Sequence, residues 1–501
     1  MSRRLFAPAF ACALLGLLLG LTGCRRDDPQ SLRLELLPFD GSPLVAVRVL
    51  VKVGSAVDPA GKEGLCRLTW RLLLEGGSRS RGPEEIAAAL APVGAGIRLD
   101  IDKEMSAFSA TVRREDWAAF YSVLSELLLE PGFRENDFER LKASQLDALR
   151  ESLAGGEDET LAGEILDRMI YAGQPYGHAE DGTLESVASL TIDEAKAFYL
   201  EHFVRGNIAI GLAGGYPTGS PESVKSDFLR LPVTFTPRLV LPPPHRPRGI
   251  EAVLAERPAD GATIAMGIPV SLTAADEDFF ALWVAAAHLG EPGFPASRLG
   301  RLGTASVGSS GLDCEATSAS ALPRRGCCFA IRLHPADQSA ALFLVRQAAR
   351  ELRLLAEEGL PEERFDLVRD YLLHSLSLRS RTLGDRLARR MEAGILVRAD
   401  VLEEARRILP RLSAGDIRAA VRKYVDPEAF FLAIVAKDAS ALRDGLLSGA
   451  AASLPEAARS AGGGAAEEIA AIQAYPLGIR PEAVRVVAAE SLIHTAWPPG
   501  E

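Results

Sequence analysis

The stretch Gly64-Leu-Cys-Arg-Leu-Thr-Trp-Arg-Leu-Leu-Leu-Glu-Gly-Gly-Ser78 decides how the rest of the chain is interpreted. It predicts a helix that runs through residues 63–75. Positions three and four apart share one face of a helix, so Arg67, Trp70 and Arg71 are expected close together. A guanidinium has no lone pair for a metal, and an indole only donates hydrogen bonds. This face therefore offers neither a metal ligand nor a general base.

Strands and helices alternate irregularly around this helix. Alternating apolar and polar residues predict strands between residues 32 and 53, at 97–102 and at 105–112, and amphipathic runs predict long helices at 115–129 and 135–153. A capping box formed by Thr191 and Glu194 begins another helix, which ends near His202 and precedes a strand at 208–213. This mixture predicts α+β layers, in which helices cover a mixed sheet.

The same order of elements occurs twice. Residues 130–142 resemble residues 358–369, and residues 190–203 resemble residues 412–425. We therefore expect two copies of one domain of about 220 residues. We place them at residues 32–240 and 250–497, with a Pro-rich linker at 241–249. Repeated domains commonly enclose a site, so a cleft is expected between them.

Residues 1–23 have the features of a bacterial lipoprotein signal. Two arginines precede an apolar run, and Leu-Thr-Gly precedes Cys24. The signal is expected to be removed once Cys24 carries lipid, which leaves residues 24–31 as a tether. A simple transmembrane anchor is the alternative, but the apolar run is short. The protein is then expected in the bacterial cell envelope, facing the periplasm, and Arg25 favours the outer membrane by its resemblance to enterobacterial sorting signals.

Composition and charge narrow the class of protein. Apolar residues make up 48% of the 501 residues and charged residues 25%, which is typical of a soluble globular protein. The formal net charge of −11 argues against nucleic acid as a partner, because phosphates would be repelled. The cysteines beyond Cys24 would lie in an oxidising compartment, and their spacing assigns no disulfide. They are Cys66, Cys314, Cys327 and Cys328.

Three segments resemble the pitrilysin/insulinase (inverzincin) metallopeptidase family. Residues 64–78 resemble its G-L-A-H-x-x-E-H-x-L-x-x-G-T signature. Residues 171–178 resemble its L-F-x-G-H-P-Y-G segment, and residues 190–203 its L-T-x-x-D-L-x-x-F-Y-x-x-H-Y segment. The likeness covers nearly all of residues 32–495 in the family's order. It implies two homologous α/β sandwich domains, each a mixed sheet covered by helices, that enclose a cleft.

The resemblance also implies what is missing. In active members two histidines and a later glutamate bind zinc, and a glutamate between the histidines activates water. Here Arg67 and Arg71 stand at the histidine positions, Trp70 stands at the glutamate position, and the third ligand falls near Ala148. The chain is identified as a degenerate, non-catalytic member for which no cofactor is expected.

Two interpretations of the arginines stay open. They clamp a carboxylate or phosphate, or they form salt bridges to Asp147 or Glu151 and fill the vacated site; we favour the second. None of the seven histidines lies within four residues of another, so the sequence contains no local ligand pair. A metal site assembled from distant residues stays open as well.

Resemblance to the family's heterodimers suggests a function. In these, the partner of the zinc subunit supplies an arginine and a tyrosine, whereas residues 297–308 contain Arg298 and Arg301 as possible substrate contacts but no tyrosine. We expect a proteolytically inactive partner subunit or peptide-binding pseudoenzyme, paired with a zinc-binding family subunit or a second copy of itself. The alternatives are an active zinc metallopeptidase with a displaced site and an envelope scaffold lipoprotein.

Overall fold

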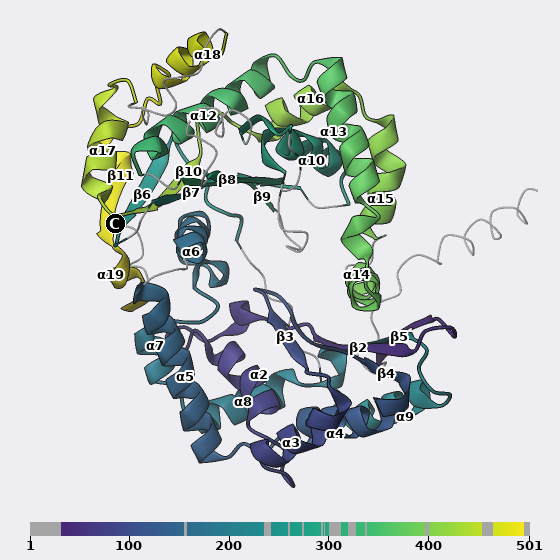
Figure 1. Cartoon of the computed structure of the whole chain (residues 1–501). Coiled ribbons are helices and arrows are strands. Elements are labelled where there is room, and N and C mark those ends of the chain that lie inside the picture. Colours follow the sequence, from purple (N-terminus) through teal and green to yellow (C-terminus); the bar gives the residue numbers. More distant parts are fainter. Residues whose placement is uncertain are drawn as a thin grey trace, which may run out of the picture.

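The computed structural model of the chain places two sheets one above the other, each with helices on its outer face (Figure 1). It describes residues 32–154, 158–234, 242–258, 261–272, 275–291, 294, 296–299, 312–318, 327–335, 338–395, 400–452 and 464–494. The predicted signal, Cys24, the tether and Arg301 lie outside the described residues. In the part of the chain that is described, no helix is long and apolar enough to cross a membrane.

The N-terminal half is built on a mixed sheet with the strand order β1-β5-β2-β4-β3. The strands are β1 (Arg33–Pro38), β2 (Leu44–Val51), β3 (Arg98–Ile101), β4 (Ser106–Arg113) and β5 (Ile208–Gly214). The helices are α2 (Leu65–Glu75), α3 (Pro83–Leu90), α4 (Trp117–Leu129), α5 (Glu135–Ala154), α6 (Asp158–Ile170), α7 (Leu184–Ala188), α8 (Ile192–His202) and α9 (Ser220–Phe228). β1 is parallel to β5, and the other neighbouring strands are antiparallel.

The C-terminal half has a second mixed sheet with the strand order β11-β6-β10-β7-β9-β8. The strands are β6 (Glu251–Glu256), β7 (Ala262–Val270), β8 (Leu312–Ser318), β9 (Cys327–Pro335), β10 (Phe431–Ala436) and β11 (Val484–Ala488). The helices are α10 (Glu277–Gly290), α12 (Ala341–Glu357), α13 (Glu362–Ser375), α14 (Leu383–Ile395), α15 (Val401–Ile408), α16 (Ala414–Tyr424), α17 (Ala439–Ser448), α18 (Gly464–Gln473) and α19 (Ala489–His494).

The two sheets repeat one topology. In each, the first strand of the half pairs in parallel with the last strand of the repeat, and three antiparallel pairings follow in the same order. β11 is an additional edge strand parallel to β6. The predicted fold of two mixed-sheet domains is therefore confirmed, and the change from one sheet to the other falls between Gly214 and Glu251.

Most predicted elements occur with small changes at their ends. The helix expected at 63–75 begins at Leu65, and the helix expected from residue 115 begins at Trp117 after a turn of 3-10 helix at Arg114–Asp116. The capping box is present as predicted, since the Thr191 hydroxyl accepts a hydrogen bond from the backbone N–H of Glu194 at 3.3 Å. The backbone around α2, which carries the candidate site, was thus predictable to within two residues.

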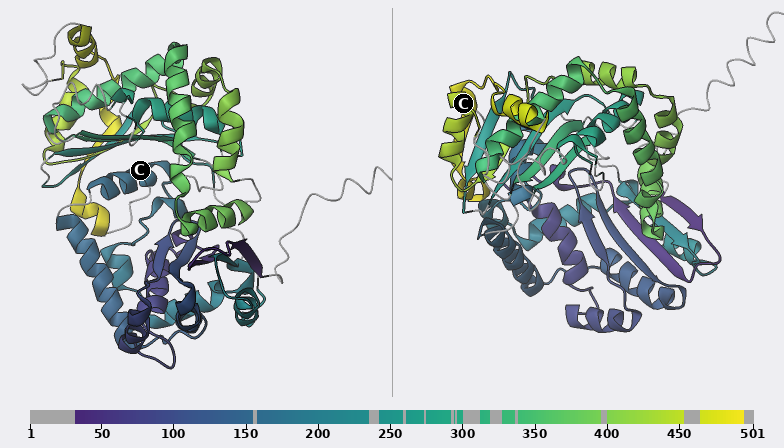
Figure 2. Two further views of the ribbon diagram at one scale, coloured as in Figure 1. Left: turned by 45° about the vertical axis from the view of Figure 1, so that its right-hand side comes forward. Right: turned by 45° about the horizontal axis from the view of Figure 1, so that its top comes forward.

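Each half contributes one helix to the inner face of the other half's sheet. Leu161 and Ile165 of α6 belong to an apolar cluster with Phe431 of the second sheet. Leu387 and Met391 of α14 lie against β2 and β5 of the first sheet. Figure 2 shows α6 and α14 between the two sheets. The interior between the halves is therefore partly filled by these two helices, and the halves are held together by apolar packing.

Candidate functional site

The N-terminal end of α2 is fixed by a buried carboxylate and by two glycines. Asp58 accepts hydrogen bonds from the backbone N–H groups of Gly64 at 2.9 Å and Cys66 at 2.8 Å. Gly64 has φ 92°, and a Cβ there would meet the backbone oxygen of Asp181 at 2.6 Å. Gly182 (φ 82°) lies against the backbone of Glu63 in the same way. The loop that carries Asp181 therefore packs directly on the start of α2.

Trp70 does not face the same space as the two arginines. Its side chain has no exposed area, and its ring centroid lies 5.6 Å from that of Phe198 and 6.1 Å from those of Phe108 and Phe203. One residue step turns a helix by about 100°, which carries Trp70 away from Arg71 and into the apolar core. The expectation that three altered residues would lie together is therefore wrong for Trp70.

Arg67 and Arg71 are neutralised by carboxylates. The Arg67 guanidinium forms ion pairs with Asp181 and with Glu180, the latter at 3.7 Å between Nη2 and Oε2. Arg71 pairs with Glu75 one turn along α2, with 2.9 Å between Nε and Oε1. Both arginines therefore form salt bridges, as expected. The carboxylates that they contact are not the predicted ones, Asp147 and Glu151.

The predicted partners are engaged elsewhere or point outward. Asp147 pairs with Arg150 on its own helix, with 2.7 Å between Oδ1 and Nη1, and Glu151 is exposed to solvent. Neither residue forms an ion pair with Arg67 or Arg71. The partners that Arg67 has instead come from the loop after residue 178, which the two glycines bring against α2.

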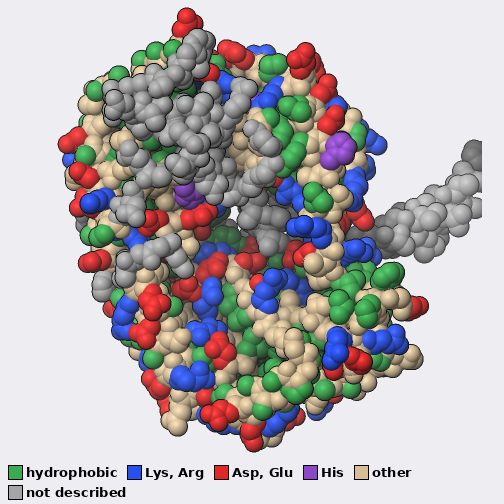
Figure 3. All heavy atoms as spheres, viewed as in Figure 1, with side chains coloured by type: hydrophobic (Ala, Val, Ile, Leu, Met, Phe, Trp, Pro, Cys, Tyr) green, Lys and Arg blue, Asp and Glu red, His purple; other side chains and the backbone are tan. Residues whose placement is uncertain are grey.

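A cavity of about 280 Å³ lies beside the two arginines. Residues of α2, α5 and α6 and of the loop at 181–182 line it, among them Arg67, Arg71 and Ala148. The structure therefore brings together the positions that the family resemblance assigns to the three zinc ligands. In Figure 3 the surface is hollowed between the two halves, and acidic and basic side chains stand side by side along its lower margin.

Two charged residues of α6 complete the wall of the cavity, and sequence reasoning missed both. Burial raises the pKa of Glu164 to about 7, against the opposing effect of the Arg168 charge. Arg168 is itself buried and donates a hydrogen bond from Nη1 to the backbone oxygen of Leu492 at 2.6 Å. The sequence carried no clear signal for Glu164, because Thr160, Asp167 and Arg168 share its face of α6 and a polar face is ordinarily solvated.

These residues do not fit zinc. A zinc site needs three or four imidazole, thiolate or carboxylate ligands, and guanidinium groups would repel the cation. The cavity wall offers the carboxylates of Glu164 and Asp181, and Asp181 is paired with Arg67. Across the described ranges, no group of three or more His, Cys, Asp or Glu residues is arranged to hold a metal ion.

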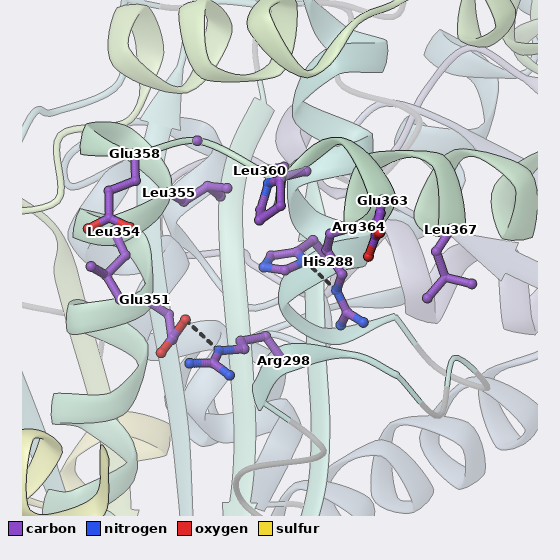
Figure 4. Close-up of a pocket in the computed structure, with 12 residues that line it drawn as sticks. His288, Arg298, Glu351, Leu354, Leu355, Glu358, Leu360, Glu363, Arg364 and Leu367 are labelled. Atoms are coloured by element: carbon purple, nitrogen blue, oxygen red, sulfur yellow. Dashed lines mark hydrogen bonds and ion pairs between the residues drawn. The ribbon is translucent and has the colours of Figure 1, made fainter. Parts of the chain in front are cut away.

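The second predicted region lies on the C-terminal half, at another cavity of about 490 Å³ (Figure 4). Arg298 pairs there with Glu351, at 2.9 Å between Nε and Oε2, and with Glu468. Arg364 donates from Nε to Nδ1 of His288 at 3.2 Å, and burial lowers the pKa of His288 to about 3. Arg298 therefore holds α12 and α18 together, and His288 is a neutral, packed helix residue.

Comparison with known proteins agrees with this fold and site. The profile of the family described as insulinase (peptidase family M16) matches residues 38–177, and that of the peptidase M16 inactive domain matches residues 189–372. The chain belongs to the insulinase family.

The curated relatives include proteins named as zinc proteases and one named as a non-peptidase homolog. An uncharacterized zinc protease of Mycobacterium leprae is 24% identical over 193 residues, which is 38% of this chain and 42% of that protein. The non-peptidase homolog YmxG of Helicobacter pylori is 24% identical over 172 residues, which is 34% of this chain and 39% of the relative. The chain thus matches about two fifths of the length of these relatives.

Solved structures share this fold over most of the chain. The peptidase M16 inactive domain from Pseudomonas fluorescens has a TM-score of 0.71 and 19% identity, covering 81% of this chain and 95% of that one. A chain of complex III from Candida albicans has a TM-score of 0.67 and 14% identity, covering 81% and 94%. At these identities the likeness concerns the fold alone.

Proposed function

We propose that this protein is a non-catalytic insulinase-family subunit that binds peptides and works with a zinc-bearing relative, anchored to the bacterial cell envelope. The observation that carries the proposal is the pairing of Arg67 with Asp181 and Glu180 in the cavity shared with Arg71 and Ala148. In this family those positions hold the metal. Here they hold two cations and a methyl group.

Each residue that replaces a zinc-site residue makes favourable contacts in the folded protein, which supports a stable non-catalytic state. Arg67 has carboxylate partners, Arg71 has Glu75, and Trp70 fills a space between three phenylalanines. Restoring one ligand would leave the others absent, because zinc binding in a protein requires several ligands at once.

A role beside a second subunit draws support from the relatives. One structural neighbour is a chain of complex III, and one curated relative is named a non-peptidase homolog. A protein that keeps the two-sheet fold and its interior space can still hold a peptide, even where its own chemistry is lost. We favour this role over that of an envelope scaffold because a cavity with a charged wall is present at this site.

The test is peptide cleavage by the purified protein, without its first 24 residues, alone and mixed with an intact zinc-motif relative from the same bacterium. We expect no cleavage by this chain alone, and faster or altered cleavage by the mixture than by the relative alone. The matched control is the mixture containing a Glu201→Gln variant, which changes an exposed carboxylate on α8 and should leave the effect of the mixture unchanged. Cleavage by this chain alone that a chelator abolishes would instead establish an active enzyme with a displaced site.

Anchoring is tested separately by Cys24→Ala. We expect the natural protein to sediment with membranes and to take up labelled fatty acid, and the variant to lose the label because it lacks the thiol that carries lipid. Label retained by the variant would contradict the lipoprotein assignment.

A further inference from the structure

The cavity beside α2 contains a carboxylate that nothing in the described part of the chain neutralises directly. Arg67 and Arg71 each contact carboxylates, and Arg168 contacts the carbonyl of Leu492. Glu164 lines the same cavity, and no hydrogen bond or ion pair joins its carboxylate to any described residue. The cations at this site are thus occupied, and an acceptor remains.

A second acceptor borders the same space. Gln145 is 2% exposed, and its amide nitrogen donates to the backbone oxygen of Asp181 at 2.9 Å and to that of Gly64 at 3.3 Å. Its amide oxygen is buried and has no hydrogen-bond partner among the described residues. A buried polar atom without a partner costs free energy, which a bound hydrogen-bond donor would recover.

The charge and the size of the cavity indicate which donor fits. The three arginines that line the cavity, Arg67, Arg71 and Arg168, each have an acceptor already, whereas the Glu164 carboxylate has no donor among the described residues. An entering cation would pair with the Glu164 carboxylate, whereas an anion would meet arginines that are already engaged, so a cation is favoured over an anion. A volume of about 280 Å³ is at or below the lower end for a drug-sized ligand and suits one long side chain.

We propose that this cavity binds the side chain of a lysine or arginine from a peptide, with the carboxylate of Glu164 and the amide oxygen of Gln145 as acceptors. The inference rests on the proposed function, because it names the ligand of a peptide-binding, non-catalytic subunit. It takes the place of the earlier interpretation in which Arg67 and Arg71 clamp a carboxylate of the ligand, because both arginines are already paired with carboxylates of the chain.

The electrostatic surroundings of Glu164 agree with a cationic ligand. Burial raises its pKa to about 7, and Asp181 and Asp167 raise it further, whereas Arg168 and Lys103 lower it. A cation that enters the cavity would stabilise the ionised carboxylate and lower this pKa. Binding should therefore weaken as the pH falls below about 7, since Glu164 then takes a proton.

The experiment is calorimetry with blocked tripeptides, acetyl-Gly-X-Gly-amide, in which X is lysine, arginine, norleucine or glutamate. We expect the lysine or arginine peptide to bind, and the norleucine peptide to bind at least about tenfold more weakly, because a charge-assisted hydrogen bond contributes about 1.5–3 kcal/mol. Glu164→Gln should weaken lysine or arginine binding by a similar factor. Glu201→Gln, an exposed carboxylate on α8, is the matched control and should leave binding unchanged.

Three results with peptides that bind would overturn the inference. They are equal binding of the norleucine and lysine peptides, no effect of Glu164→Gln, and preferential binding of the glutamate peptide, which would restore the arginine clamp. Failure of all four peptides to bind also overturns it. None of these outcomes bears on cleavage by a mixed pair of subunits, so the two proposals fail independently. Circular dichroism of each variant verifies that it is folded.

Discussion

Replacing Glu164 with glutamine should make the protein more stable at pH 8 and leave its stability at pH 4.5 nearly unchanged. Burial raises the pKa of Glu164 from its ordinary value of 4.5 to about 7. The folded state thus holds a proton that the unfolded state releases between these values. The natural protein therefore loses stability as the pH rises from about 4.5 through 7, and the variant does not.

The size of the effect follows from the difference between the two pKa values. At about 1.36 kcal/mol per pKa unit, full ionisation of the folded-state carboxyl costs about 3 kcal/mol. Glu164 is half-buried and faces the cavity, where water reduces this cost. We expect the variant to be more stable than the natural protein by about 1–2 kcal/mol at pH 8.

The assay is urea unfolding at pH 4.5, 6 and 8, followed by circular dichroism, with Glu201→Gln as the control. The free-energy difference between the Glu164→Gln variant and the natural protein should grow with pH and level off above about 7. A difference that is the same at all three pH values, or one that decreases with pH, would refute the reasoning.

Three other substitutions test the packing around the site. Trp70→Ala should lower the free energy of unfolding by about 3–5 kcal/mol, because it empties a fully buried space between aromatic rings, and a loss below 1 kcal/mol in urea unfolding would contradict that burial. Met391→Ala should cost about 2–5 kcal/mol, since it removes a buried contact of α14 with the first sheet, whereas Leu378→Ala, at a residue 63% exposed, should cost little. Arg67→Ala should cost only about 0–1 kcal/mol, and less in 1 M salt, because its ion pairs are partly exposed.

The sequence allowed the repeat and the candidate helix to be predicted because both depend on local pattern. The capping box at Thr191 and the periodicity of α5 are read from neighbouring residues, and the structure contains both. The position of Ala148 opposite Arg67 also followed, since the spacing of ligands along a family's helices is preserved when their chemistry is lost.

The partners of the arginines could not be predicted in this way. Asp181 is far from Arg67 along the chain and reaches it only because Gly64 and Gly182 allow two backbone segments to approach. Helical periodicity also places Trp70 on the same side of α2 as Arg67. Only the tertiary packing shows that the Trp70 indole points into the apolar core and not into the cavity.

The hydrophobic pattern of the sequence also could not predict that α6 and α14 each pack on the sheet of the other half. An amphipathic helix shows that it has an apolar face, and the sequence does not say which sheet will cover that face. Two glycines inside strands did indicate that a helix packs closely on each sheet. A Cβ at Gly267 would meet Leu166 of α6 at 2.9 Å, and one at Gly211 would meet Met391 of α14. Glycine in a strand interior often marks such a close approach.

The most direct test of the central claim is the zinc content of the purified protein, measured by elemental analysis after growth with zinc and dialysis against metal-free buffer. The arginines at positions 67 and 71 and their carboxylate partners occupy the place of the metal, so we predict far less than one zinc per chain. One tightly held zinc per chain, lost together with peptide cleavage on treatment with a chelator, would contradict the account.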